Sequence, residues 1–159
     1  MNIWTSKRWK KVYAEKSVRS GIRLIIDKNV DPEVRRAIKE FTAWMRERYS
    51  FPIRIRVYVK SSERIKAQDG DMVCGTILLP DSLYVEPNIR LATGDYNDLE
   101  AEIGKDNALA AIIRTLIHEV THYYQWINCV TLTEIGTERQ ATAYTNIILD
   151  EYAQTREHP

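Results

Sequence analysis

The feature that most constrains this chain is an apolar segment, from Asp106 to about Asn128, that carries the sequence HEVTH at residues 118–122. Its apolar residues recur at helical spacing, which predicts one long amphipathic helix capped by Asp106. Residues four apart lie one turn apart on the same face of a helix. His118 and His122 can therefore offer imidazole nitrogens to a single metal ion.

Glu119 is rotated by about 100° from His118 around this helix, so it would flank the ion rather than bind it. A carboxylate in that place can take a proton from water, which is the general-base role in metallohydrolases with an H-E-x-x-H motif. Zn²⁺ is the metal we expect, because zinc sites commonly use imidazole nitrogen. The competing interpretation is a helix with two solvated or core histidines, but the uncharged residues around the motif favour the metal site.

The helix is expected to be amphipathic. Its face opposite the histidines is apolar and should belong to the core, whereas the face beside them is mixed and should line a cleft. The expected core residues are Leu109, Ile112, Ile113, Leu116, Val120, Tyr123 and Ile127.

The third ligand is open between two carboxylates, since a catalytic zinc site usually has three protein ligands. Glu134 ends a T-x-x-E sequence that begins at Thr131 and is typical of a capping box, so it has a structural explanation. Glu138 falls on the face of the last helix that should turn inward, where a carboxylate needs a charge partner or a metal. We therefore expect Glu138 rather than Glu134. His158, next to the end of the chain, is not expected to bind the metal.

The rest of the pattern predicts a small sheet and two more helices, because segments with strand-like alternation are interleaved with helical spacing. Asp31 and Pro32 are typical of a helix N-cap and first residue. Residues 1–20 are a basic arm or helix. The expected strands are 21–27, 53–60, 73–79 and 84–92, the expected helices are 31–49 and 131–156, and the expected loops are 61–71 and 93–104.

Length and composition favour one domain over residues 1–159, with 44% hydrophobic and 28% charged residues. Two cysteines are too few for a disulfide framework. The first residues lack the apolar run of a signal peptide, and no stretch approaches the about 18 apolar residues of a membrane span. We expect a cytoplasmic protein with no membrane partner.

The charge is divided unevenly along the chain. Residues 1–60 carry 16 Lys/Arg and 6 Asp/Glu, whereas the remainder carries 7 and 16. Such a division can mark a surface for nucleic acid or an acidic partner, or two faces that attract each other within one fold. The sequence contains no nucleic-acid-binding motif, which favours the second explanation. The pattern does not indicate an oligomeric state.

These residues resemble a zincin metallopeptidase of the gluzincin type, and the order of elements is similar to the compact ImmA/IrrE-type peptidases. The resemblance is carried by HEVTH at 118–122 and by ERQA at 138–141, since the third ligand of those enzymes is a Glu three residues before an Ala on the following helix. The segment from Gly75 to Leu91 is similar to their strands before the motif. The resemblance covers roughly residues 53–150.

The resemblance implies an α+β fold: a compact zincin-like domain whose small, mostly antiparallel sheet packs on an N-terminal helix and the H-E-x-x-H helix, followed by a C-terminal helix with the third ligand. It implies a zinc-dependent metallopeptidase that cleaves a protein or peptide substrate, with Glu119 as general base and His118, His122 and Glu138 on the metal. An extended substrate would pair with the strand at 89–92 by β-addition.

The alternative function is a catalytically silent zincin-fold module that binds nucleic acid or an acidic protein through the basic N-terminal half. A silent module has no chemical need for Glu119, so its presence favours the enzyme.

Overall fold

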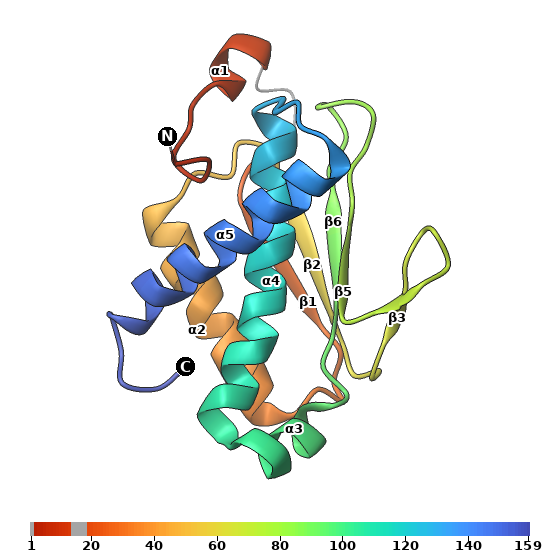
Figure 1. The fold of residues 1–159 in the computed structure, drawn as a ribbon, viewed down its shortest axis with the longest axis vertical. Helices are drawn as coiled ribbons and strands as arrows, with labels where there is room; N and C mark the ends of the chain where they lie inside the picture. The colour runs from red at the N-terminus through yellow and green to blue at the C-terminus, as the bar shows by residue number, and fades with distance from the viewer. Residues whose placement is uncertain (1, 14–18) are drawn as a thin grey trace.

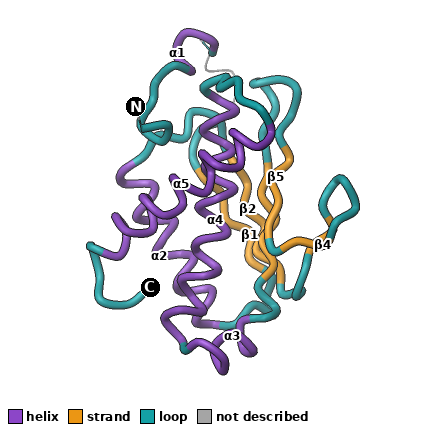
Figure 2. Tube along the Cα trace, in the orientation of Figure 1, coloured by secondary structure: helices purple, strands orange, loops and turns teal. Residues whose placement is uncertain are grey.

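The fold of this chain, a computed structural model that describes residues 2–13 and 19–159, is a four-stranded sheet with helices packed on one face (Figures 1 and 2). The strand order of the sheet is β1-β2-β6-β5. Its strands are β1 (Ile22–Ile26), β2 (Ile55–Lys60), β5 (Gly75–Leu78) and β6 (Asn88–Ala92), and β3 (Ile65–Lys66) and β4 (Met72–Val73) form a separate pair. The helices are α1 (Trp9–Val12), α2 (Pro32–Arg48), α3 (Tyr96–Ile103), α4 (Lys105–Ile127) and α5 (Glu134–Ala153).

The sheet is mixed, which corrects the expectation of a mostly antiparallel sheet. β1 pairs with β2 and β2 pairs with β6 in parallel, whereas β5 is antiparallel to β6. For β1 and β2 the reason is α2, whose 17 residues extend for about 25 Å and return the chain to the end of the sheet where it started. Strands joined by such a crossover run parallel. The α+β class and a small sheet packed against helices are confirmed.

The first strands and α2 form where the sequence predicts them. In β2, Ile55, Val57 and Val59 are buried and the residues between them are half-buried, as the alternation indicates. The Asp31 carboxylate caps α2 by accepting a hydrogen bond from the Glu33 N–H at 2.8 Å. The apolar face of α2 covers the sheet from the side that also receives α4 (Figure 1).

A helix, α3, occupies most of the segment 93–104 that the acidic composition marks as a loop. Its apolar residues Tyr96, Leu99 and Ile103 stand at helical spacing, and Tyr96 is buried. Gly104 then has a φ of 87°, a conformation that glycine adopts without strain. It turns the chain directly from α3 into α4. The expectation that Asp106 caps α4 is therefore wrong, because α4 begins at Lys105 with Gly104 as its N-cap.

The core face of α4 is buried as predicted, and two tyrosine hydroxyls anchor the helix to the loop before β2. The Tyr123 hydroxyl donates to the Ile53 carbonyl at 2.6 Å and accepts from its N–H at 3.1 Å. The Tyr124 hydroxyl donates to the Ser50 carbonyl at 3.0 Å. These bonds, far apart in sequence, fix how α4 lies across the sheet and therefore where its histidines point.

The N-terminal segment is an arm that packs on the back of α4. Ile3 and Trp4 are both 2% exposed, and the Trp4 Nε1–H donates to the Thr121 hydroxyl at 3.0 Å. Within the described residues up to Tyr13, the short helix α1 follows. The part of the predicted arm or helix at residues 14–18 lies outside the described residues. In the part of the chain that the structure describes, none of the helices combines the length and apolar character needed to cross a membrane.

α5 begins at Glu134, so the capping box predicted for Thr131 and Glu134 is wrong. Thr133 is the N-cap, and its hydroxyl accepts from the Gly136 N–H at 3.1 Å. Thr133 directly precedes the first helical residue, so Thr133 rather than Thr131 stands in the N-cap position. Glu134 then lies in the first turn, where the helix dipole favours a negative charge.

Replacing Thr133 with alanine should lower the free energy of unfolding by about 0.5–2 kcal/mol, the usual effect of losing a helix cap. Chemical denaturation of Thr133→Ala measures the loss, and Thr131→Ala is the matched control that should stay near wild type. An equal loss in both variants would show that Thr133 is not the cap.

Candidate metal centre

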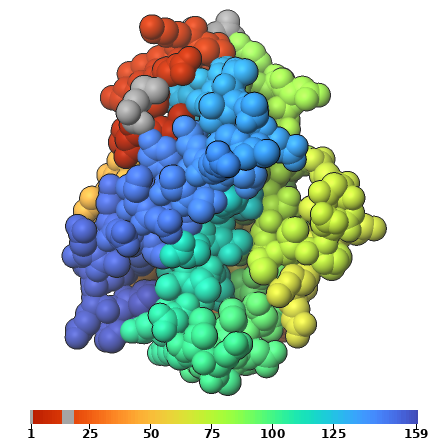
Figure 3. Space-filling view, viewed as in Figure 1, coloured from red at the N-terminus to blue at the C-terminus, as the bar shows by residue number. Residues whose placement is uncertain are grey.

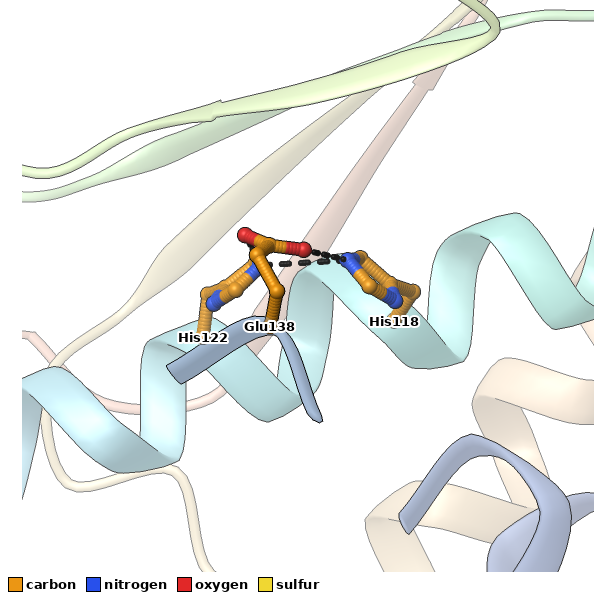
Figure 4. A group of neighbouring side chains, drawn as sticks. All are labelled: His118, His122 and Glu138. Carbon is orange, nitrogen blue, oxygen red and sulfur yellow. Dashed lines mark hydrogen bonds and ion pairs between the residues drawn. The ribbon is translucent and has the colours of Figure 1, made fainter. Parts of the chain in front are cut away.

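His118, His122 and Glu138 converge between α4 and α5 (Figure 4). The His118 Nε2 lies 3.0 Å from the Glu138 Oε2, and the His122 Nε2 lies 3.2 Å from the Glu138 Oε1. The two Nε2 atoms are 3.2 Å apart. One ligand atom from each residue can be chosen so that all three lie within 4.8 Å of one another. The geometry therefore brings together the three residues that the sequence selects.

The donor set fits zinc. Two imidazole nitrogens and a carboxylate oxygen form a ligand set that zinc uses in hydrolytic sites, and ligands about 2.0–2.2 Å from a tetrahedral ion lie about 3.4 Å apart. The two Nε2 atoms, 3.2 Å apart, are close to that spacing. They contact different oxygens of Glu138, His118 the Oε2 at 3.0 Å and His122 the Oε1 at 3.2 Å, and one of these oxygens forms with both nitrogens a set that lies within 4.8 Å. The imidazoles come from successive turns of one helix, so the backbone of α4 holds two of the three ligands together.

Glu138 reaches the histidines from an exposed position, which corrects the reason for choosing it. Its side chain is 56% exposed, and Ile135 on the supposed inward stripe is 65% exposed. The first turns of α5 extend beyond the core, so its buried residues begin at Ala141. Glu134, the other candidate, is exposed at the start of the helix and is not part of the three-residue group.

Glu119 is the buried carboxyl group of the site, at 8% exposure. Burial raises the pKa of Glu119 to about 7, and the negative charge of Glu138 contributes in the same direction. A carboxyl group with such a pKa can accept and donate a proton near neutral pH. Glu119 and His118 share the wall of a cavity of about 250 Å³. The cavity is lined by Arg114, Thr115, His118, Glu119, Thr142 and Thr145.

The two imidazoles differ in their surroundings. Burial and the neighbouring His122 lower the pKa of His118, although Glu138 opposes this shift. A lower pKa favours the neutral imidazole, which is the form that binds a metal. His122 has a second contact that was not predicted: its Nδ1 lies 2.8 Å from the Oε1 of Gln125, one turn further along α4. The only sequence signal for Gln125 is its place beside the histidine face.

His158 lies outside this site, as expected. Its Nδ1 contacts the Asp106 Oδ2 at 2.7 Å, and this hydrogen bond raises the pKa of His158. The contact ties the C-terminal end of the chain to the first turn of α4, away from the turn that carries the metal ligands.

The strand beside the site is β5, not β6, which corrects the expected substrate edge. β6 pairs with β2 on one side and β5 on the other, so both of its backbone edges are used within the sheet. β5 is the edge strand. After β5 the chain turns back, and β6 runs antiparallel to it in the position between β5 and β2. In the space-filling view, part of α4 (teal) remains visible between α5 (blue) and the segment around β4 and β5 (yellow-green) (Figure 3).

Gly75 lets β5 lie close against α4. A Cβ at this position would stand 2.6 Å from the Thr115 Cγ2 and 3.6 Å from the Glu119 Cγ. Gly75→Ala should therefore destabilise the protein by about 1–3 kcal/mol, the usual effect of overpacking.

Thr115→Ser removes the obstructing methyl group and keeps the hydroxyl that bonds the Ala111 carbonyl. The double variant Gly75→Ala/Thr115→Ser should recover much of the loss in a denaturation experiment, with Thr115→Ser alone as the control. Strictly additive effects would show that Thr115 is not the obstacle.

Comparison with known proteins finds no protein-family model, no curated protein sequence and no solved structure that matches this chain.

Proposed function

We propose that this chain is a zinc-dependent metallopeptidase with a zincin-like domain, and that His118, His122 and Glu138 bind the metal. The observation that carries the proposal is the convergence of three ligand atoms within 4.8 Å, next to a buried carboxyl group on the same helix as the histidines. An exposed acidic cluster alone would not suffice, but here two imidazoles and one carboxylate meet from two helices.

Zinc, when bound, supplies Lewis acidity that makes a water molecule acidic near neutral pH and polarises a carbonyl group. The chain supplies the proton carrier. Glu119 lies next to His118 in sequence and lines the same cavity, so its carboxylate can accept a proton from a nucleophilic water and pass it to the leaving amine. Burial limits the competition of bulk water for this group.

The open edge of β5 supports an extended peptide as the substrate. The Ala92 N–H donates to the Cys74 carbonyl, which lies opposite it in the register. In an antiparallel pair, residues whose backbone groups bond to the partner strand alternate with residues whose groups point away from it. The backbone groups of Gly75 and Ile77 therefore point away from β6. Among the described strands none pairs with that edge. A substrate strand added there would run beside the turn of α4 that carries Glu119.

Metal titration and a peptidase assay test the proposal together. The ion-free protein should bind one zinc per chain at neutral pH, measured by competition with a chromophoric chelator. Cleavage of an unfolded protein or a peptide library should require zinc, stop on addition of a chelator and return when zinc is restored. Failure of the wild-type protein to bind zinc under these conditions would overturn the proposal.

The second candidate is an anion-binding module that acts through the basic face of the sheet. Arg23 of β1 stands beside Arg56 of β2 in the register, on the side of the sheet away from the buried residues, and Arg90 of β6 shares that side. Glu86 compensates part of this charge by pairing with Arg56 at 2.8 Å.

Binding of single-stranded DNA with a steep salt dependence, in the absence of any peptide cleavage, would favour this second candidate.

The cytoplasmic location stays a prediction. Cys74 and Cys129 are free, which agrees with the absence of a disulfide framework.

A further inference from the structure

Gln125 connects both helices of the candidate metal centre. It is 5% exposed and follows His122 by three residues on α4. Its Oε1 lies 2.8 Å from the His122 Nδ1. Its Nε2 lies 3.0 Å from the Thr137 carbonyl oxygen and 2.9 Å from the Gln140 Oε1, both on α5. All of these partners except His122 therefore belong to the turns of α5 that flank Glu138.

The orientation of the Gln125 amide follows from the chemistry of its partners. The Thr137 carbonyl can only accept a hydrogen bond, so the atom of Gln125 that faces it must be the nitrogen. The oxygen of the same amide then faces His122, and it too can only accept. His122 must therefore carry a proton on Nδ1. In the neutral ring this leaves the lone pair on Nε2, which is the atom that faces His118 and Glu138.

We propose that Gln125 is a positioning residue of the metal centre. It holds His122 in the tautomer whose Nε2 can bind a metal, and it ties α4 to the turn of α5 that presents Glu138. Gln140 completes the arrangement by accepting the second N–H of the Gln125 amide. The metal-related part of this inference rests on the proposed function, whereas the tautomer can be measured without any metal.

An apolar residue could fill the space of Gln125 but could not select the tautomer. Partners that orient a metal-binding histidine typically contribute 10–100-fold to metal affinity. Gln125→Met keeps a side chain of similar length and removes both the acceptor for His122 and the donors to α5. Gln140→Met leaves the His122 contact in place and removes one acceptor for the Gln125 amide. Gln68→Met, at an exposed position in the turn between β3 and β4, is the matched control.

The first experiment measures the tautomer in the ion-free protein. Long-range ¹H–¹⁵N spectra at about pH 8, where free imidazole is neutral, distinguish a proton on Nδ1 from a proton on Nε2. We expect Nδ1–H for His122 in the wild type, in Gln140→Met and in Gln68→Met. Gln125→Met should shift the population toward Nε2–H, while the His158 signals, which report the separate contact with Asp106, stay in place.

The second experiment measures zinc affinity by chelator competition. Gln125→Met should lose about 10–100-fold, Gln140→Met should lose less, and Gln68→Met should match the wild type. A His122 Nδ1 without a proton in the wild type, or unchanged zinc affinity in folded Gln125→Met, would overturn the inference even though zinc binds.

The two proposals fail in different ways. If the wild type binds no zinc, the proposed function is wrong, and the spectra still decide whether Gln125 sets the tautomer. If Gln125→Met does not fold, as circular dichroism would show, the wild-type spectrum and Gln140→Met carry the test. A His122 Nδ1 without a proton, or an affinity loss in Gln140→Met as large as that in a ligand variant, contradicts the assigned roles.

Discussion

Glu119→Gln is expected to bind zinc as the wild type does and to hydrolyse peptides about 10²–10⁴-fold more slowly, the usual contribution of a general base. Glutamine has nearly the same shape as glutamate, so the cavity beside His118 should keep its form. Its amide cannot accept the proton that the carboxylate accepts. Steady-state cleavage rates together with zinc content per chain measure the two expectations separately.

Glu134→Gln is the matched control, because it makes the same change at an exposed carboxylate of α5 that does not belong to the ligand group. Its cleavage rate should equal that of the wild type. Full peptidase activity in Glu119→Gln would show that another group carries the proton and that the assigned mechanism is wrong.

Glu138→Ala should weaken zinc binding by more than about 100-fold, a larger effect than the 10–100-fold typical of residues that only orient a ligand. Its carboxylate is the only contribution of α5 to the three-residue group, and its removal leaves the ion with two imidazoles and water. Because the Glu138 side chain is 56% exposed, the substitution should change the free energy of unfolding of the ion-free protein only slightly. Zinc titration and chemical denaturation of the ion-free protein separate these effects.

Glu134→Ala serves as the comparison for the third ligand. The structure removes its supposed capping role, since Thr133 is the N-cap. The zinc affinity of Glu134→Ala should stay near that of the wild type, and its free energy of unfolding should fall by no more than the about 0.3–1 kcal/mol that a first-turn carboxylate contributes. Zinc lost from Glu134→Ala and retained by Glu138→Ala would reverse the ligand assignment.

Much of the fold could be predicted because local signals and burial agree. Asp31 and Pro32 mark the start of α2, and the alternation at 55–60 marks a half-buried strand, so both elements appear where the sequence indicates. α3 was missed because its acidic composition hides a short apolar spacing. The parallel pairing of β1 with β2 was missed because strand patterns carry no direction. The length of α2 decides it by returning the chain along the sheet.

Glu138 was predicted as a ligand because it should be buried, but its side chain is exposed. Its spacing along the last helix predicted a buried face, where a carboxylate would need a partner. In the structure its side chain is exposed, and it approaches the histidines because α5 crosses α4 at that turn (Figure 1). Spacing along the chain could not reveal this crossing, since it depends on the direction in which the loop at 128–133 leads the chain from α4 into α5.

The sequence by itself determined that His118 and His122 share one helix face with Glu119 beside them, because a helix relates residues four apart without help from the rest of the chain. Only the tertiary structure decided which strand borders the site, how Glu138 reaches it and which side chains surround His122. These depend on contacts between segments distant in sequence, such as Gly75 against Thr115 and Gln125 against Thr137. Packing and hydrogen bonding between elements, rather than local periodicity, set those contacts.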